Sequence, residues 1–129
     1  MKNQFCSPKA AVIYEDKKVY IAFAKKPMAK GHIIVFWKRD VPDLHALSRK
    51  DYDYLMDVVD VMRSAMLHVF HTSKVYLFYL DEIGHVHWHL LPRLKEKGFS
   101  ILLNAYRTTA DFRTAPKLQE SFRAIRSEF

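Results

Sequence analysis

The sequence predicts an α+β fold: a mainly antiparallel five-stranded sheet, with a long helix after the third strand and a second helix at the C-terminal end. Five short runs are rich in β-branched and aromatic residues, and turn residues separate them. One amphipathic helical pattern interrupts these runs between the third and the fourth. Because 129 residues match the size of one ordinary domain, we expect a single domain over residues 1–129.

The first three strands are predicted in the N-terminal third of the chain. The runs 11–15 and 18–23 are joined by a polar turn and predict a hairpin. Pro27 and Gly31 punctuate the connection to the third run, 32–37. That run is too continuously apolar to have one face in water, so we expect it to lie centrally in the sheet.

Two helices are predicted, one in the middle of the chain and one at its end. Ser48 can cap the start of the first, with Asp51 three residues further on. Apolar residues then recur at three- and four-residue spacing over about four turns: Leu55, Val58, Val59, Met62, Met66 and Val69. The tail from Ala115 to Phe129 carries a shorter pattern of the same kind. We expect the methionines of the first stripe to fill the core.

The last two strands of the sheet are predicted at 74–80 and 85–91. Only the residues 81–84 join them, so the two runs should be adjacent antiparallel partners. The run 99–103 is expected to be a short further strand or an extended segment.

Composition and charge limit the classes of function. The net charge of +7 suits a protein that meets anions, but the basic residues are spread without a run of five or more. This spread favours a solvated basic surface over a nucleic-acid groove. No apolar stretch approaches the roughly 20 residues that cross a bilayer, and the N-terminal residues do not resemble a signal peptide. We therefore expect a cytoplasmic protein, without a membrane partner. The single cysteine, Cys6, excludes an internal disulfide and a cysteine-rich zinc module.

Three imidazoles stand at every second residue near the end of the predicted sheet. Since a strand alternates its faces, His85, His87 and His89 should point to one side, and the apolar residues between them to the other. Three interpretations are open: structural histidines, a metal site, or phosphoryl or nucleotidyl transfer by a neutral imidazole. The chain offers no carboxylate or cysteine partner at ligand spacing, so transfer is favoured and no metal or other cofactor is expected. A pKa near 6.5 keeps much of an ordinary histidine neutral and nucleophilic in the cytoplasm.

The segment His-Val-His-Trp-His-Leu-Leu at 85–91 resembles the motif His-φ-His-φ-His-φ-φ, in which φ is hydrophobic. That motif belongs to the histidine triad (HIT) family of nucleotide hydrolases and transferases. The Pro92-Arg93 that follows is also similar to the family, as are the upstream Gly31-His32 pair and the Lys38-Arg39 loop. In all, the stretch from Val19 to Arg93 follows the order of the family.

The resemblance implies an α+β fold, a homodimer, and cleavage of a small-molecule nucleotide at its α-phosphorus through a covalent nucleotidyl-histidine. By this resemblance His87 is the nucleophile, and His85 and His89 flank the phosphate. His89 is the better candidate for contact with phosphate or leaving-group oxygens. His32 is the fourth imidazole that supports the site and helps bind the substrate.

The chain departs from the family pattern at several positions near this motif. Ala24 stands where the family usually has an Asp or Asn that holds the ribose hydroxyls. The approach to the triad is short, and it carries Asp81 and Glu82, whose charges would repel a polyphosphate. Asp40 replaces the histidine of a Lys-Arg-His sequence. Two alternatives therefore stay open: a non-catalytic nucleotide-binding or regulatory protein, and a metal-dependent hydrolase.

Overall fold

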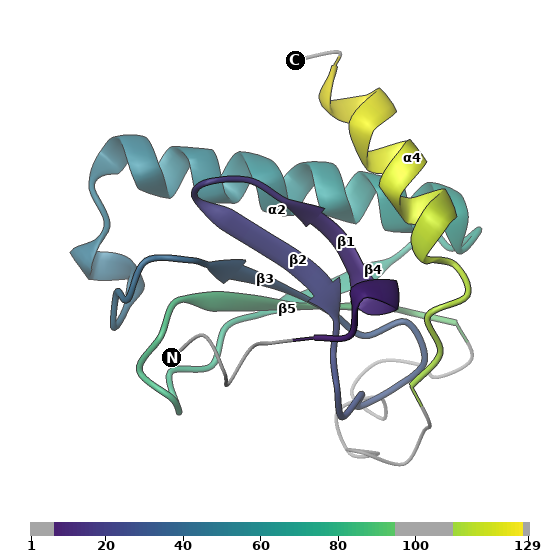
Figure 1. Cartoon of the computed structure of the whole chain (residues 1–129), viewed down its shortest axis with the longest axis horizontal. Helices are drawn as coiled ribbons and strands as arrows, with labels where there is room; N and C mark the ends of the chain where they lie inside the picture. Colours follow the sequence, from purple (N-terminus) through teal and green to yellow (C-terminus); the bar gives the residue numbers. More distant parts are fainter. Residues whose placement is uncertain (1–6, 95–109, 128–129) are drawn as a thin grey trace.

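A computed structural model describes residues 7–94 and 110–127 of the chain (Figure 1). Five strands form one sheet in the order β1-β2-β3-β5-β4, and every neighbouring pair is antiparallel. The strands are β1 (Val12–Glu15), β2 (Val19–Phe23), β3 (Ile33–Trp37), β4 (Val75–Phe78) and β5 (His87–Pro92). The predicted α+β class is confirmed, with the third strand at the centre of the sheet. The expected segment at 99–103 lies outside the described residues.

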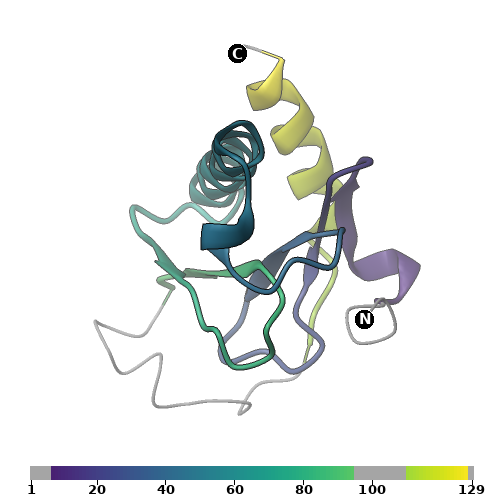
Figure 2. The same cartoon turned by 90° about the vertical axis from the view of Figure 1, so that its left-hand side faces the viewer.

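The helices α2 (Arg49–Val69) and α4 (Ala115–Arg126) lie on the same side of the sheet (Figures 1 and 2). Two short 3-10 turns, η1 (Lys9–Ala11) and η2 (Leu44–Ala46), precede β1 and α2. The helix α4 packs against both α2 and β1. Neither α2 nor α4, the helices of the described ranges, is long and apolar enough to cross a membrane.

The start of α2 and its buried stripe follow the sequence prediction. The Ser48 hydroxyl accepts a hydrogen bond from the backbone N–H of Asp51 at 3.1 Å, which satisfies one of the unpaired donors of the first turn. Five of the six residues of the predicted stripe are buried, and Val69 is partly buried against the core. Met62 and Met66 are fully buried in the core, as expected.

The two faces of the sheet have different surroundings. Val35 of β3 and Leu90 of β5 belong to the same buried core as α2. Because side chains alternate along a strand, His87 and His89 lie on the face opposite α2. On that face, Leu91 forms a second, smaller apolar cluster. We call this surface the far face of the sheet.

The predicted strand 74–80 ends two residues early, at Phe78, and the predicted start of the histidine strand is also wrong, which affects the triad. The strand β5 begins at His87, so His85 lies just before it. In a regular antiparallel ladder, Trp37 and Val86 would exchange both of their backbone hydrogen bonds. Trp37 N–H does donate to Val86 O at 3.0 Å, but Val86 N–H donates to Val41 O instead. The loop after β3 therefore takes the N–H of Val86, and the ladder between β3 and β5 ends at the pair Phe36–His87.

Gly31 is a tightly packed glycine near the triad. It has a φ of +84°, and a Cβ there would lie 2.6 Å from Pro92 Cγ and 3.2 Å from Phe70 Cζ. Gly84 also has a positive φ, of +60°, but a Cβ there would meet nothing within 4 Å. An alanine at Gly84 would therefore have backbone strain alone, whereas an alanine at Gly31 would have backbone strain and steric overlap.

We expect Gly31→Ala to lower the free energy of unfolding by roughly 2 to 5 kcal/mol, because strain and overlap with Pro92 add together. Gly84→Ala is the matched control, with strain alone and a loss of about 1 to 2 kcal/mol. Urea denaturation of both variants measures the difference. Equal losses in the two variants would show that the contact between Gly31 and Pro92 is not tight.

Candidate functional site

The structure brings the four histidines singled out by the sequence into one cluster. His87 and His89 come from β5, His32 immediately precedes β3, and His85 lies two residues before the start of β5. The ring centroids of His87 and His89 are 4.9 Å apart, and those of His32 and His89 are 5.1 Å apart. His32, His85 and His87 are at most 5% exposed, so only His89 is partly open to solvent.

The His87 ring is held in one tautomer by a backbone carbonyl. Its Nδ1 lies 2.6 Å from the carbonyl oxygen of His85. Since a carbonyl only accepts hydrogen bonds, Nδ1 carries the proton and donates it. Burial lowers the pKa of His87, which keeps the ring neutral near pH 7. In the neutral ring, Nε2 then carries the lone pair, which is what a nucleophile at phosphorus needs.

A second chain of hydrogen bonds fixes the tautomers of His32 and His89. The backbone N–H of Met28 donates to His32 Nδ1 at 3.1 Å, so the proton of neutral His32 is on Nε2. That Nε2–H donates to His89 Nδ1 at 2.9 Å. The proton of neutral His89 is therefore on its own Nε2. His89 thus presents an N–H donor, whereas His87 presents a lone pair.

Burial keeps these rings uncharged. It lowers the pKa of His32 to about 3 and that of His89 to about 4, and in each case a neighbouring histidine adds to the effect. The ring of Phe78 stacks on His89 at 4.8 Å, with only 5° between the planes. Phe36 packs against His87 at 6.1 Å. Aromatic side chains on both neighbouring strands thus cover part of the His87 and His89 rings.

His85 is turned toward the loop that follows β3. Its Nε2 lies 2.6 Å from the carbonyl oxygen of Trp37, to which it donates. Its Nδ1 lies 3.4 Å from a carboxylate oxygen of Asp40. The backbone and the ring of His85 therefore have separate functions: its carbonyl holds His87, while its ring holds the loop.

Sequence reasoning did not assign Phe36, Phe78 or Asp40 to the site. The two phenylalanines lie opposite His87 and His89 in the strand register. Alternation from His32 along the third run would have placed Phe36 on the histidine face. Asp40 was noted only as a departure from the family pattern, and no local pattern predicts its approach to His85.

Ala24 lies beside the cluster. Its backbone N–H donates to the carbonyl of His32 at 2.9 Å, and the residue is only 4% exposed. The position at which the family pattern has a polar side chain is thus a buried methyl group next to the histidines.

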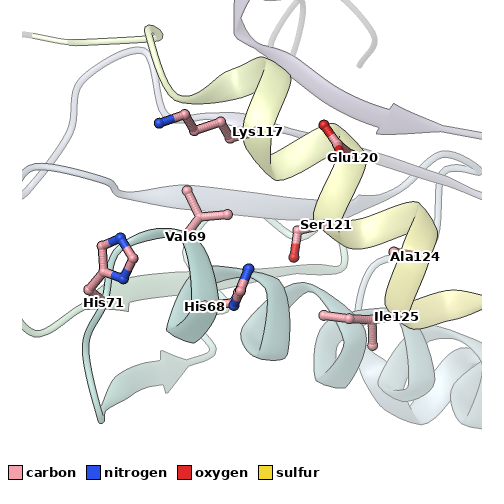
Figure 3. A pocket seen from close by; sticks show the side chains of 8 residues that line it. All are labelled: His68, Val69, His71, Lys117, Glu120, Ser121, Ala124 and Ile125. Atoms are coloured by element: carbon pink, nitrogen blue, oxygen red, sulfur yellow. The ribbon is translucent and has the colours of Figure 1, made fainter.

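A groove of about 570 Å³ lies elsewhere, between α4 and the C-terminal end of α2 (Figure 3). His68, His71 and Lys117 contribute polar groups to its walls. The groove contains none of the four clustered histidines and lies on the helical side of the sheet. Within residues 7–94 and 110–127, no three histidine, cysteine, aspartate or glutamate side chains are arranged to hold a metal ion.

Comparison with known families matches residues 7–96 to the HIT domain. The match covers more than half of the chain and includes all four clustered histidines. The chain therefore belongs to the HIT family, as the sequence motif predicted. No curated protein sequence shows significant similarity to it.

Solved structures of HIT proteins share the fold. A Zn-bound histidine triad family protein from Mycobacterium smegmatis is 19% identical, with a TM-score of 0.73, over 95% of this chain and 90% of that one. A Hit-like protein from Bartonella henselae is 20% identical, with a TM-score of 0.69, over 93% and 90%. The diadenosine triphosphate hydrolase of Plasmodium falciparum is 20% identical, with a TM-score of 0.64, over 95% and 78%. At such identities, these structures establish the fold alone.

Acid should destabilise the protein through His32 and His89. Their folded-state pKa values, about 3 and about 4, lie below the unfolded value near 6.5, so the unfolded chain binds more protons as the pH falls below 6.5. We expect the free energy of unfolding to decrease between pH 6.5 and 4, by up to about 1.4 kcal/mol per pH unit for each ring. Denaturation at several pH values measures this slope. The double variant His32→Gln/His89→Gln should flatten it, and an unchanged slope would contradict the assignment.

Proposed function

We propose that this protein is a nucleotidyl hydrolase or transferase, with His87 as its nucleophile. The observation that carries the proposal is the 2.6 Å hydrogen bond from His87 Nδ1 to the carbonyl of His85. This bond gives the neutral ring a lone pair on Nε2, beside the N–H donor of His89. A lone pair and a donor at adjacent positions suit attack on a phosphorus whose oxygens need stabilisation.

In the first step, the Nε2 lone pair of His87 attacks the α-phosphorus of the substrate. The new P–N bond forms as the bond from phosphorus to the leaving group breaks, and the leaving group departs with that electron pair. His89 Nε2–H donates to a phosphate or leaving-group oxygen, where negative charge develops. A leaving group that is too basic to depart as an anion takes its proton from water.

In the second step, a water molecule or another acceptor attacks the nucleotidyl-histidine. The P–N bond breaks and its electron pair returns to His87 Nε2, while the proton of the attacking water passes to solvent. His87 is restored as the neutral Nδ1–H tautomer that the carbonyl of His85 selects. No cofactor is needed in either step.

The substrate we propose is a small nucleoside phosphate ester, anhydride or phosphoramidate. The methyl group of Ala24 cannot accept hydrogen bonds from ribose hydroxyls. The charge of Asp81 acts on His87, where it slightly offsets the lowering of the pKa by burial. A carboxylate this close would repel a long polyphosphate, so we favour a substrate with few negative charges beyond the α-phosphate.

His87→Ala should abolish turnover while the fold stays intact. We expect kcat to fall by at least about 1000-fold, because the covalent intermediate can no longer form. Rapid quench of the wild type with α-³²P-labelled substrate should trap label on His87. His45→Ala, which removes an exposed histidine on η2, is the matched control and should keep full activity. An active His87→Ala protein would contradict the proposal.

Two alternative functions are distinguished from the proposed one by binding, turnover and chelation measurements. The first alternative is a non-catalytic nucleotide-binding or regulatory protein. Ala24 favours it, because this residue lacks the polar side chain that would bind the ribose hydroxyls. Such a protein would bind nucleotides in calorimetry yet turn over no phosphoramidate, dinucleoside polyphosphate or nucleotide sugar. A metal-dependent hydrolase would lose its activity after exhaustive chelation and regain it with added metal.

We also propose that the protein forms a homodimer across the edge of the sheet at β4. Within the described residues, β4 pairs only with β5. Leu77 on this strand and Leu80 just after it are 39% and 41% exposed. An edge strand with exposed apolar side chains is a surface on which a second copy can pair.

Leu77→Lys should weaken this dimer, because a second copy would have to bury the new charge. Sedimentation velocity should show a shift toward the monomer relative to the wild type. Ala124→Lys, at an exposed position on α4, is the control and should leave the dimer unchanged. A wild-type protein that is monomeric at all concentrations would overturn this part of the proposal.

A further inference from the structure

The loop between Trp37 and Val41 wraps around the residues that precede β5. Trp37 N–H donates to Val86 O at 3.0 Å, and Val86 N–H donates to Val41 O at 3.0 Å. Both backbone groups of Val86 are thus bound by this one loop. Asp40 is the residue immediately before Val41.

The loop also binds the His85 ring at both nitrogens. The ring donates from Nε2 to the carbonyl of Trp37, which a regular ladder would have paired with the N–H of Val86. The ring Nδ1 lies 3.4 Å from Asp40 Oδ1. Since a carboxylate oxygen only accepts, this contact is a hydrogen bond when Nδ1 carries a proton in addition to the one on Nε2. The His85 side chain is only 2% exposed, whereas that of Asp40 is 71% exposed. A buried ring is therefore held from outside by a solvated carboxylate.

The orientation of His87 depends on this anchor. The carbonyl that accepts from His87 Nδ1 belongs to His85 itself. If the His85 ring turns or withdraws from the loop, the backbone of His85 keeps the hydrogen bonds of Val86 but loses the side-chain contacts that help to fix this carbonyl. The lone pair of His87 would then no longer be held in one direction. A displacement of about 1 Å at a reacting group can reduce a rate by roughly 100-fold.

We propose that Asp40 is a positioning residue, which holds the His85 ring against the loop after β3 and thereby orients His87. This inference rests on the proposed nucleotidyl transfer for its effect on rate. It assigns a function to a position where the chain departs from the Lys-Arg-His pattern. Asp40 itself touches no reacting atom.

The first arm of the test is kinetic. Because Asp40 is mostly exposed, Asp40→Ala and Asp40→Asn should keep the thermal midpoint of the wild type. We expect kcat to fall about 10-fold in both variants, with KM changed less than about twofold, and Asp40→Glu to restore part of the loss. Asp53→Asn is the matched control. It removes an exposed carboxylate on α2 that pairs with Arg49 and not with a histidine of the cluster, so it should leave kcat unchanged. An unchanged kcat in Asp40→Ala and Asp40→Asn would overturn the proposal.

The second arm does not require turnover. In protein labelled with ¹⁵N-histidine, the wild type should show His87 protonated at Nδ1, and Asp40→Ala should weaken or exchange-broaden that signal. Asp53→Asn should retain it. An unchanged His87 signal in Asp40→Ala would overturn the positioning function. A wild type without any turnover, but with an Asp40-dependent His87 signal, would overturn the proposed function while supporting the position assigned to Asp40.

Discussion

The hydrogen bond between the His85 ring and the carbonyl of Trp37 determines how the histidine cluster is built. A buried carbonyl at the end of a strand needs a partner, and the neighbouring strand would normally supply it. Here a side chain supplies it, so the backbone of Val86 is released to pair with Val41. The ladder ends at this point, His85 leaves the strand, and its own carbonyl becomes available to His87. One exchange of partners thus links the end of β3, the loop after it and the proposed nucleophile.

The neighbouring rings owe their different properties to different backbone groups, although all are imidazoles on or beside one strand. A backbone carbonyl makes His87 a donor at Nδ1, and a backbone N–H makes His32 an acceptor at Nδ1. Because His32 donates to His89 Nδ1, the proton of neutral His89 is on its Nε2. Because burial keeps these three rings neutral near pH 7, the assignment does not depend on small changes of pH.

Local patterns predicted most of the fold, and the reasons are visible in particular residues. The stripe of α2 and its Ser48 cap depend on spacing within one helix, and the pairing of β4 with β5 depends on a short connection. The start of β5 at His87, and not at His85, could not be predicted, since it depends on a loop almost fifty residues away in the sequence. The same holds for the approach of Asp40 to His85. The motif indicated which residues gather, while the tautomers depend on hydrogen bonds that form only in the folded chain.

The chain of hydrogen bonds from Met28 through His32 to His89 runs in one direction and ends at a peptide group. Along this chain, a proton that His89 gave up from Nε2 could be replaced only from His32, and that of His32 only from the amide of Met28. An amide does not release its proton under these conditions, so the pair is a fixed donor and not a proton wire. In the proposed reaction, a proton for the departing group therefore comes from bulk water, to which His89 is partly open. Because the chain from Met28 to His89 supplies no proton, sealing this site against solvent would slow the release of basic leaving groups in the proposed reaction.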